Sequence, residues 1–303
     1  MATTTLTLPD EAQFGIAQEP AKWRTAARLA RANPLGTIGL LIVLAFMFAG
    51  IFGPYLTPYE PTGTDVSAQL EWPSLDHPFG TNGLGNDVLS RVLAGARLSF
   101  VIGLAAVGIG VIGGSLIGVA SGYFGGFVDS VIQRTGEAGS AFPGLIFYLT
   151  LIAAIGRGVD TIIIGIAITA LLGGSRVLRA MTLVVKTSPF VEAARAAGAT
   201  EFRILFTHII PNVIPIIIVI ASSALGAAVL AEAALSFLGI GVEVGTPSWG
   251  NDLQGNTIRD AKVGYWYLVL FPGAALSLVV LGFNLLGDTL RDILDPRLRG
   301  SLR

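Results

Sequence analysis

Long apolar stretches alternate with short polar segments along the whole chain. A helix needs about 20 apolar residues to cross the hydrocarbon core of a bilayer. Six stretches approach or exceed that length and predict membrane spans, namely residues 35–56, 98–122, 142–155, 159–172, 209–235 and 265–286. The third is short, and we expect the preceding segment 128–141 to extend its helix. The pattern therefore predicts an all-α polytopic membrane protein with about six transmembrane helices.

Lysine and arginine positions predict the orientation of these spans. If the N-terminus is cytoplasmic, fourteen of the 19 basic residues fall on the cytoplasmic side. Short cytoplasmic segments of membrane proteins carry such an excess of positive charge. An even number of spans then places both termini in the cytoplasm.

Composition narrows the class of protein. The chain is 52% hydrophobic and only 13% charged, whereas an average soluble domain is about 25% charged. This excludes a soluble globular domain and a disordered chain. The net charge of -1 gives no indication of nucleic-acid binding.

Candidate chemistry is sparse. The absence of cysteine excludes disulfides and thiolate catalysis. The two histidines, His77 and His208, are far apart in sequence, so we predict no metal site and no catalytic residues. No lysine lies in a G-x-x-x-x-G-K-[ST] pattern, and the chain is therefore not expected to hydrolyse ATP itself.

Small residues recur on the second span. Gly110, Gly114, Gly118 and Gly122 are spaced by four residues and so share one helical face. Such a face lets two membrane helices approach closely. We interpret it as a packing surface, with a role in permeation as the alternative.

A few polar residues stand out within or beside the spans. Glu232 lies near the end of the fifth span, where a carboxylate is costly unless it is paired, hydrated or facing a cavity. It is either a pathway or gating residue or an acid hydrated at the outer interface. Asn284, in the last span, either lines the pathway or bonds between helices. The spacing of Asp129, Arg134 and Glu137 suggests local pairing on one helix.

The longest cytoplasmic connection predicts two short helices. Ser188 and Pro189 are typical of a helix start, and Gly198 is typical of a helix end. Thr200 can cap a second helix over residues 201–207. A short helix with small side chains fits a groove on another protein, although two solvated connecting helices would have the same pattern.

The same loop resembles a known motif. Glu192-Ala193-Ala194, followed by Gly198 and later by Pro211, is similar to the E-A-A loop of ABC importer permeases. The resemblance implies a coupling helix that docks into a cleft on an ATP-binding subunit. The coupling residues implied are Glu192, Ala193, Ala194, Arg195, Ala196, Ala197 and Gly198.

Three further segments resemble permeases for dipeptides, oligopeptides and nickel. They are residues 77–97, which contain His-Pro-Phe-Gly-Thr, 232–250, which begin Glu-Ala-Ala-Leu-Ser-Phe-Leu-Gly, and 284–297, which begin Asn-Leu-Leu-Gly-Asp. The resemblance covers roughly residues 25–300 and is to the second of the two permease subunits.

The resemblance implies a type I ABC importer permease fold in a bacterial plasma (inner) membrane. The expected organisation is a cytoplasmic tail (1–32), a first transmembrane helix with an outer loop (33–97), a core permease domain (98–288) with its coupling loop (176–208), and a cytoplasmic C-terminal tail (289–303). The implied partners are a second homologous permease subunit, two ATP-binding subunits, an extracytoplasmic substrate-binding protein and membrane lipid. No cofactor is expected on this chain, because ATP and Mg²⁺ belong to the partner subunits.

Alternatives remain open at this point. Dipeptides or oligopeptides are the leading substrates, with nickel, glutathione and opine-like compounds behind them. A proton-coupled secondary transporter that uses Glu232 is the rival from another class. An intramembrane enzyme ranks far lower, since no serine in a span has an obvious base partner.

Overall fold

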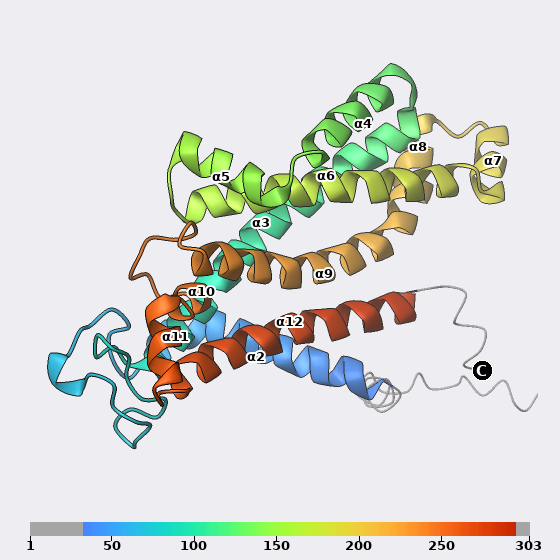
Figure 1. The fold of residues 1–303 in the computed structure, drawn as a ribbon. Helices are drawn as coiled ribbons and strands as arrows, with labels where there is room; N and C mark the ends of the chain where they lie inside the picture. The colour runs from blue at the N-terminus through green and yellow to red at the C-terminus, as the bar shows by residue number, and fades with distance from the viewer. Residues whose placement is uncertain (1–32, 295–303) are drawn as a thin grey trace, which may run out of the picture. The chain divides into compact units, whose positions relative to one another are not determined.

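A computed structural model describes residues 33–294 (Figure 1). The predicted tail 1–32 and residues 295–303 lie outside the described residues. The chain divides into two units, residues 1–34 and 35–303, and the account below concerns the second. Within the described range the chain forms helices and no β-strand. The helices are α2 (Pro34–Leu56), η1 (Val66–Ala68), α3 (Val88–Phe124), α4 (Gly126–Ser140), α5 (Gly144–Ile155), α6 (Val159–Lys186), α7 (Pro189–Ala196), α8 (Glu201–Ile204), the π-turn η2 (Leu205–Ile209), α9 (Ile210–Phe237), α10 (Trp249–Asp252), α11 (Gly255–Lys262) and α12 (Tyr267–Leu294).

Five helical stretches of the described residues are long and apolar enough to cross a membrane. They are α2, α3, α6, the continuous stretch Glu201–Phe237 and α12. A sixth candidate is the pair α4 and α5, which is bent by 91°. Figure 1 shows α6, α9 and α12 side by side, with α4 and α5 beyond α6.

The glycine face of α3 packs against α6, as predicted. A Cβ at Gly110 would lie 2.6 Å from the Ala167 carbonyl oxygen, and one at Gly114 would lie 2.8 Å from that of Leu171. The contacts keep one register, in which Gly110 faces Ala167, Gly114 faces Leu171, Gly118 faces Ser175 and Gly122 faces Arg179. Because the residue numbers increase in the same direction along both helices, α3 and α6 run parallel. The segment between them must return the chain to its starting side, so α4 and α5 together count as one crossing.

The segment 128–141 does not extend the third helix. It forms α4, which ends before Pro143 and meets α5 at the 91° bend. Proline disfavours the helical conformation of the preceding residue, here Phe142, and lacks the N–H that would continue the helical ladder. The expectation of one straight helix was therefore wrong.

Asp129 fastens α4 to α6. Its carboxylate accepts two hydrogen bonds of 2.6 Å from the guanidinium of Arg179, and it also accepts one from Ser121. The predicted local pairing among Asp129, Arg134 and Glu137 is therefore wrong, because Asp129 pairs with Arg179 on another helix.

Two spans are longer than their apolar stretches. α3 begins at Val88 instead of residue 98, and α6 ends at Lys186 instead of residue 172. Asp87 starts α3 by accepting a hydrogen bond of 2.8 Å from the Ser90 N–H. The added turns carry basic residues, which hydropathy excludes from a span although they are good helix formers.

Alanine at two glycines of α3 tests the packing with α6. Gly114→Ala places a methyl group against the Leu171 backbone, whereas at Gly108 a Cβ meets nothing within 4 Å. We expect Gly114→Ala to destabilise the purified protein by about 1–3 kcal/mol through overpacking. Gly108→Ala should leave stability unchanged or slightly raised, because alanine is the better helix former. Thermal unfolding in detergent checks this, and equal melting temperatures for both variants would contradict it.

Candidate functional site

The predicted coupling helix is α7, and it begins at Pro189. Ser188 has an extended conformation, and its backbone carbonyl accepts hydrogen bonds from the N–H groups of Val191 (3.0 Å) and Glu192 (3.2 Å). Its hydroxyl does not cap the helix but donates to the Val185 carbonyl at 2.6 Å. The helix start is where the sequence predicts it, with proline at the first position.

Gly198 ends this helix in a Schellman motif. The Ala199 N–H bonds the Ala194 carbonyl and the Gly198 N–H bonds the Arg195 carbonyl, both at 3.0 Å. Gly198 has φ of +82°, which L side chains rarely adopt, and a Cβ there would meet nothing within 4 Å. Glycine is therefore required by backbone conformation at this position and not by lack of space.

One residue anchors α7 while most of the motif stays open. Val191 is fully buried in an apolar cluster with Leu178 of α6, Ile204 of α8 and Val213 of α9. Ala194 is half-buried against the same cluster. The remaining motif residues are exposed, namely Glu192, Ala193, Arg195, Ala196, Ala197 and Gly198. The arrangement presents a short helix with small side chains on a firmly packed base.

A polar network fixes the same loop to the ends of α3 and α6. The Tyr123 hydroxyl bonds the Glu201 carboxylate and, at 3.0 Å, the Glu201 carbonyl oxygen. Arg195 of α7 pairs with the Glu201 carboxylate at 3.3 Å, and the Lys186 ammonium donates to the Tyr123 carbonyl at 2.6 Å. The sequence analysis missed this network, because its members are up to 78 residues apart and no spacing signals them.

Thr200 and Pro211 shape the connection from α7 to α9. Thr200 caps α8 by accepting a hydrogen bond from the Arg203 N–H at 3.3 Å, as predicted. The predicted helix over 201–207 instead passes into the π-turn η2, where the Ile210 N–H bonds the Leu205 carbonyl. Proline cannot donate to the carbonyl four residues earlier, and its ring clashes with it. The wider π-turn in front of Pro211 relieves that conflict.

Glu232 is fully buried and bonded to three serine hydroxyls. Its carboxylate accepts hydrogen bonds from Ser99 of α3 (3.0 Å), Ser236 of α9 (2.9 Å) and Ser248 ahead of α10 (2.8 Å). The side chain has 0% exposure, so the expectation of an acid hydrated at the outer interface was wrong. The carboxylate joins α3, α9 and the segment that precedes α10. A role in gating stays a prediction.

Asn284 has a different setting. It lies on α12 and is exposed, and its side chain makes no hydrogen bond to any of residues 33–294. The expectation of a bond between helices of this chain is therefore not met. A pathway role stays a prediction.

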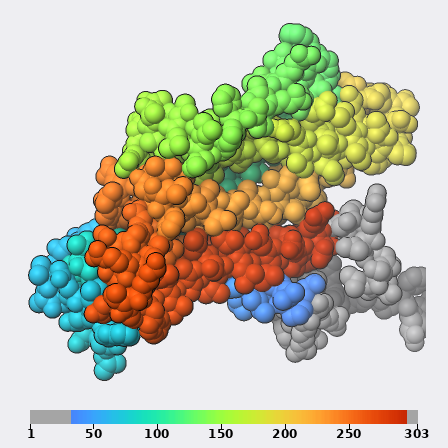
Figure 2. All heavy atoms as spheres, in the orientation of Figure 1, coloured from blue at the N-terminus to red at the C-terminus, as the bar shows by residue number. Residues whose placement is uncertain are grey.

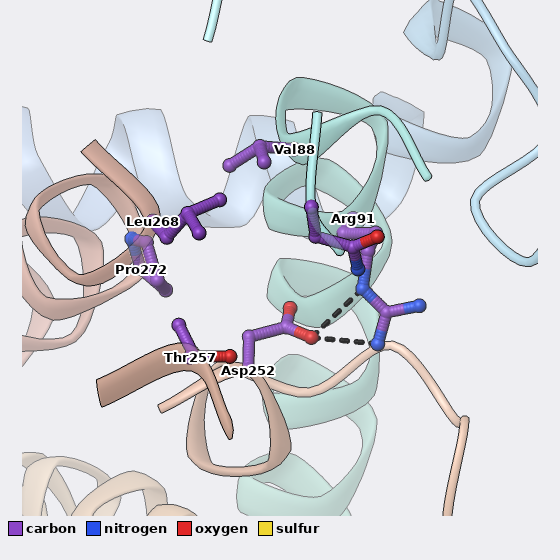
Figure 3. A pocket seen from close by; sticks show the side chains of 7 residues that line it. Val88, Arg91, Asp252, Thr257, Leu268 and Pro272 are labelled. Carbon is purple, nitrogen blue, oxygen red and sulfur yellow. Dashed lines mark hydrogen bonds and ion pairs between the residues drawn. The ribbon is translucent and has the colours of Figure 1, made fainter. Parts of the chain in front are cut away.

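At the N-terminal end of α3, Arg91 and Asp252 tie α3 to α10 (Figure 3). The Arg91 Nε and Nη2 lie 2.8 Å and 2.6 Å from Asp252 Oδ1. The third guanidinium nitrogen of Arg91, Nη1, donates to the Pro61 carbonyl at 3.1 Å. Burial raises the pKa of Asp252, and the guanidinium opposes that rise. The pair closes one side of a small cavity that Val88, Leu268 and Pro272 also line.

Comparison with known proteins identifies the family. The family described as "Binding-protein-dependent transport system inner membrane component" matches residues 114–300. The chain belongs to this family. The "N-terminal TM domain of oligopeptide transport permease C" matches residues 22–73. The chain is therefore a transport permease component and a multi-pass protein of the inner membrane, in keeping with its apolar helices.

Relatives match this permease over most of their length. It is 38% identical over 279 residues to the "Dipeptide transport system permease protein DppC" of Alkalihalophilus pseudofirmus, covering 91% of this chain and 90% of the relative. It is 39% identical over 276 residues to a putative peptide transport system permease protein of Brucella suis, covering 91% and 92%. It is also 39% identical over 279 residues to the "Glutathione transport system permease protein GsiD" of Salmonella typhimurium, covering 92% and 91%. The sequence-based expectation of an ABC importer permease is confirmed.

Substitutions at Glu232 separate its structural role from its charge. Glu232→Ala leaves three buried hydroxyls without their acceptor, at a cost of about 1–3 kcal/mol for each unsatisfied group. In Glu232→Gln, the amide oxygen can accept from Ser236 and Ser248 and the NH₂ can donate to Ser99. We expect Glu232→Ala to lower the melting temperature of this permease and Glu232→Gln to keep it. Equal stability of Glu232→Ala and the wild type would show that the three bonds do not hold the fold.

Proposed function

We propose that this permease is the translocation subunit of an ATP-driven importer of dipeptides or oligopeptides. The observation that carries the proposal is the exposed helix α7 on its buried base. Its small side chains suit insertion into a cleft of an ATP-binding subunit. The names of the relatives support peptides as the substrate class.

The proposed complex holds more than this chain. It contains a second homologous permease subunit, two ATP-binding subunits and an extracytoplasmic substrate-binding protein, with both termini of this chain cytoplasmic. ATP and Mg²⁺ bind the ATP-binding subunits, and this chain performs no covalent chemistry. Because α3 and α6 run parallel, their C-terminal ends and the α7 that follows lie on the same side of the membrane. This is the side that the basic residues assign to the cytoplasm.

In the proposed mechanism, motion enters through α7. ATP binding closes the ATP-binding subunits and displaces the docked residues Glu192–Gly198. Val191 and the Tyr123–Glu201 network connect α7 to α3, α6 and α9, so these spans move with it. The pathway then opens outward to accept substrate, and ATP hydrolysis resets it. Glu232, buried where α3 meets α9, would hold the outer ends of these two spans together during that motion.

The same importer mechanism could carry other substrates. One relative is named for glutathione transport, and nickel or opine-like compounds would use the same machinery. A proton-coupled transporter centred on Glu232 is less well supported. Its carboxylate is enclosed by three hydroxyl donors, and such a transporter would need no exposed coupling helix.

Uptake by the reconstituted complex tests the proposal. The permease and its co-purified partners are placed in proteoliposomes and offered labelled dipeptide, a longer peptide, glutathione and nickel. We expect ATP-dependent uptake of a peptide, with ATP in the compartment that α7 faces. Uptake that does not require ATP and is driven by a proton gradient would overturn the proposal.

Bulk at Gly198 tests the docking role of α7. Gly198→Trp adds a large side chain to the exposed loop and should abolish ATP-driven uptake while ATP hydrolysis by the complex continues. Gly198→Ala is the matched control. It pays the same backbone penalty of about 1 kcal/mol for the left-handed conformation but adds almost no bulk. Uptake by Gly198→Trp equal to that of Gly198→Ala would rule out docking at this position.

A further inference from the structure

The spans of this permease differ in what they expose. The open face of α3 carries Val101, Leu104, Ile109, Ile112 and Leu116, each between 45% and 67% exposed. All five are aliphatic. Such a face suits contact with lipid chains, which offer no hydrogen bonds.

The open face of α12 has another composition. Between residues 270 and 288 its exposed residues share one side of the helix, namely Leu270, Ala274, Ser277, Leu278, Leu281, Asn284 and Asp288. Three of the seven are leucines, and the other four are small or polar. The Asn284 amide lies within the apolar span and would lack a partner if it were turned toward lipid, and polar residues in spans usually face the bundle interior or water.

Neighbouring helices cover both flanks of this face. On one flank, a Cβ at Gly39 of α2 would lie 2.8 Å from the Leu285 Cβ. On the other flank, a Cβ at Gly226 of α9 would lie 3.1 Å from the Phe283 Cβ. The side between the two flanks remains open in this chain.

The open face continues onto α9. The exposed residues that share one side of α9 are Ser223, Ala227, Leu230, Ala234 and Phe237. A Cβ at Gly287 of α12 would lie 3.1 Å from the Ser223 Oγ of α9. The exposed side of α9 therefore lies next to the exposed side of α12 near Asp288. Figure 2 shows α9 and α12 together on one side of the chain. We call the exposed residues 223, 227, 230, 234 and 237 of α9 and 270, 274, 277, 278, 281, 284 and 288 of α12 the α9–α12 face.

We propose that the α9–α12 face lines the aqueous translocation pathway. On this face Ser223, Ser277 and Asn284 offer hydroxyl and amide groups to the peptide bonds and charged ends of a transported peptide. The alanines beside them, Ala227, Ala234 and Ala274, leave room for a substrate to pass. The inference rests on the proposed importer function.

Glu232 does not belong to this face. It lies nine residues, or two and a half helical turns, after Ser223, and therefore projects from the opposite side of α9. That side meets α3, where Ser99 bonds the carboxylate. Glu232 is thus enclosed on one side of α9, and the α9–α12 face is on the opposite side of that helix.

Single cysteines test the proposal, because the natural chain has none. Ser277→Cys, Asn284→Cys and Ala227→Cys are introduced separately into the full complex with its partners in proteoliposomes. Ile112→Cys on α3 is the control for a lipid-facing position. Each is treated with a membrane-impermeant thiol reagent, with and without a non-hydrolysable ATP analogue and with and without the transported dipeptide. Three positions on two helices guard against one variant that fails to assemble.

We expect the cysteines of the α9–α12 face to react about tenfold or more faster than Ile112→Cys, because the thiolate is the reactive form and apolar surroundings suppress it. Their rates should change with nucleotide and fall when the dipeptide is present. Rates as slow as that of Ile112→Cys in every state would overturn the inference, and would mean that a helix of the second permease subunit or lipid covers the face.

Uptake measured on the same vesicles separates the two proposals. Vesicles that import dipeptide with ATP but leave the three cysteines unreactive contradict the pathway assignment alone. Wild-type vesicles that show no ATP-driven uptake contradict the proposed function itself.

Discussion

The close approach of α3 and α6 is the contact on which the rest of this permease depends. Lipid chains are as apolar as leucine, so helices in a bilayer associate through packing and not through hydrophobic exclusion. Four glycines on α3 let the two backbones meet in one register. That register makes the helices parallel, forces α4 and α5 to cross back between them, and places the end of α6 beside the end of α3. The loop that carries α7 begins where those two ends meet.

Polar side chains then join helices that the glycine contact brings near. Four such ties connect elements distant in sequence, namely Arg91 with Asp252, Glu232 with its three serines, Asp129 with Arg179, and Tyr123 with Glu201. Each satisfies a charged or polar group that would otherwise be costly beside a membrane. The first two lie toward the N-terminal end of α3, and the last two lie toward α7. The long middle portions of the spans are held together by the packing of apolar and small residues.

The sequence was a good guide wherever the signal is local. Hydropathy located the spans, glycine spacing located the packed face of α3, and Pro189 and Gly198 marked the ends of α7. It failed where two local rules compete or where the partner is remote. The segment 128–141 was expected to extend the helix of the apolar stretch 142–155, but the restriction on Phe142 prevails and α4 bends away from α5. Asp129 had charged residues nearby on its own helix, yet it pairs with Arg179, 50 residues further along the chain. Of the serines that bond the buried Glu232, only Ser236, four residues along the same helix, follows from spacing, whereas Ser99 and Ser248 come from other segments.

The parallel course of α3 and α6 has a consequence for how the chain is made. Consecutive spans can pair as an antiparallel hairpin as soon as both have entered the bilayer, but helices that run in the same direction cannot. Chains emerge from the ribosome N-terminal end first, so α3 is inserted with its glycine side unmatched until α4, α5 and then α6 have followed. The contact that organises the finished protein is therefore among the later ones available during biogenesis. Until then the exposed backbone of that glycine side must be shielded by lipid, by another subunit or by the insertion machinery.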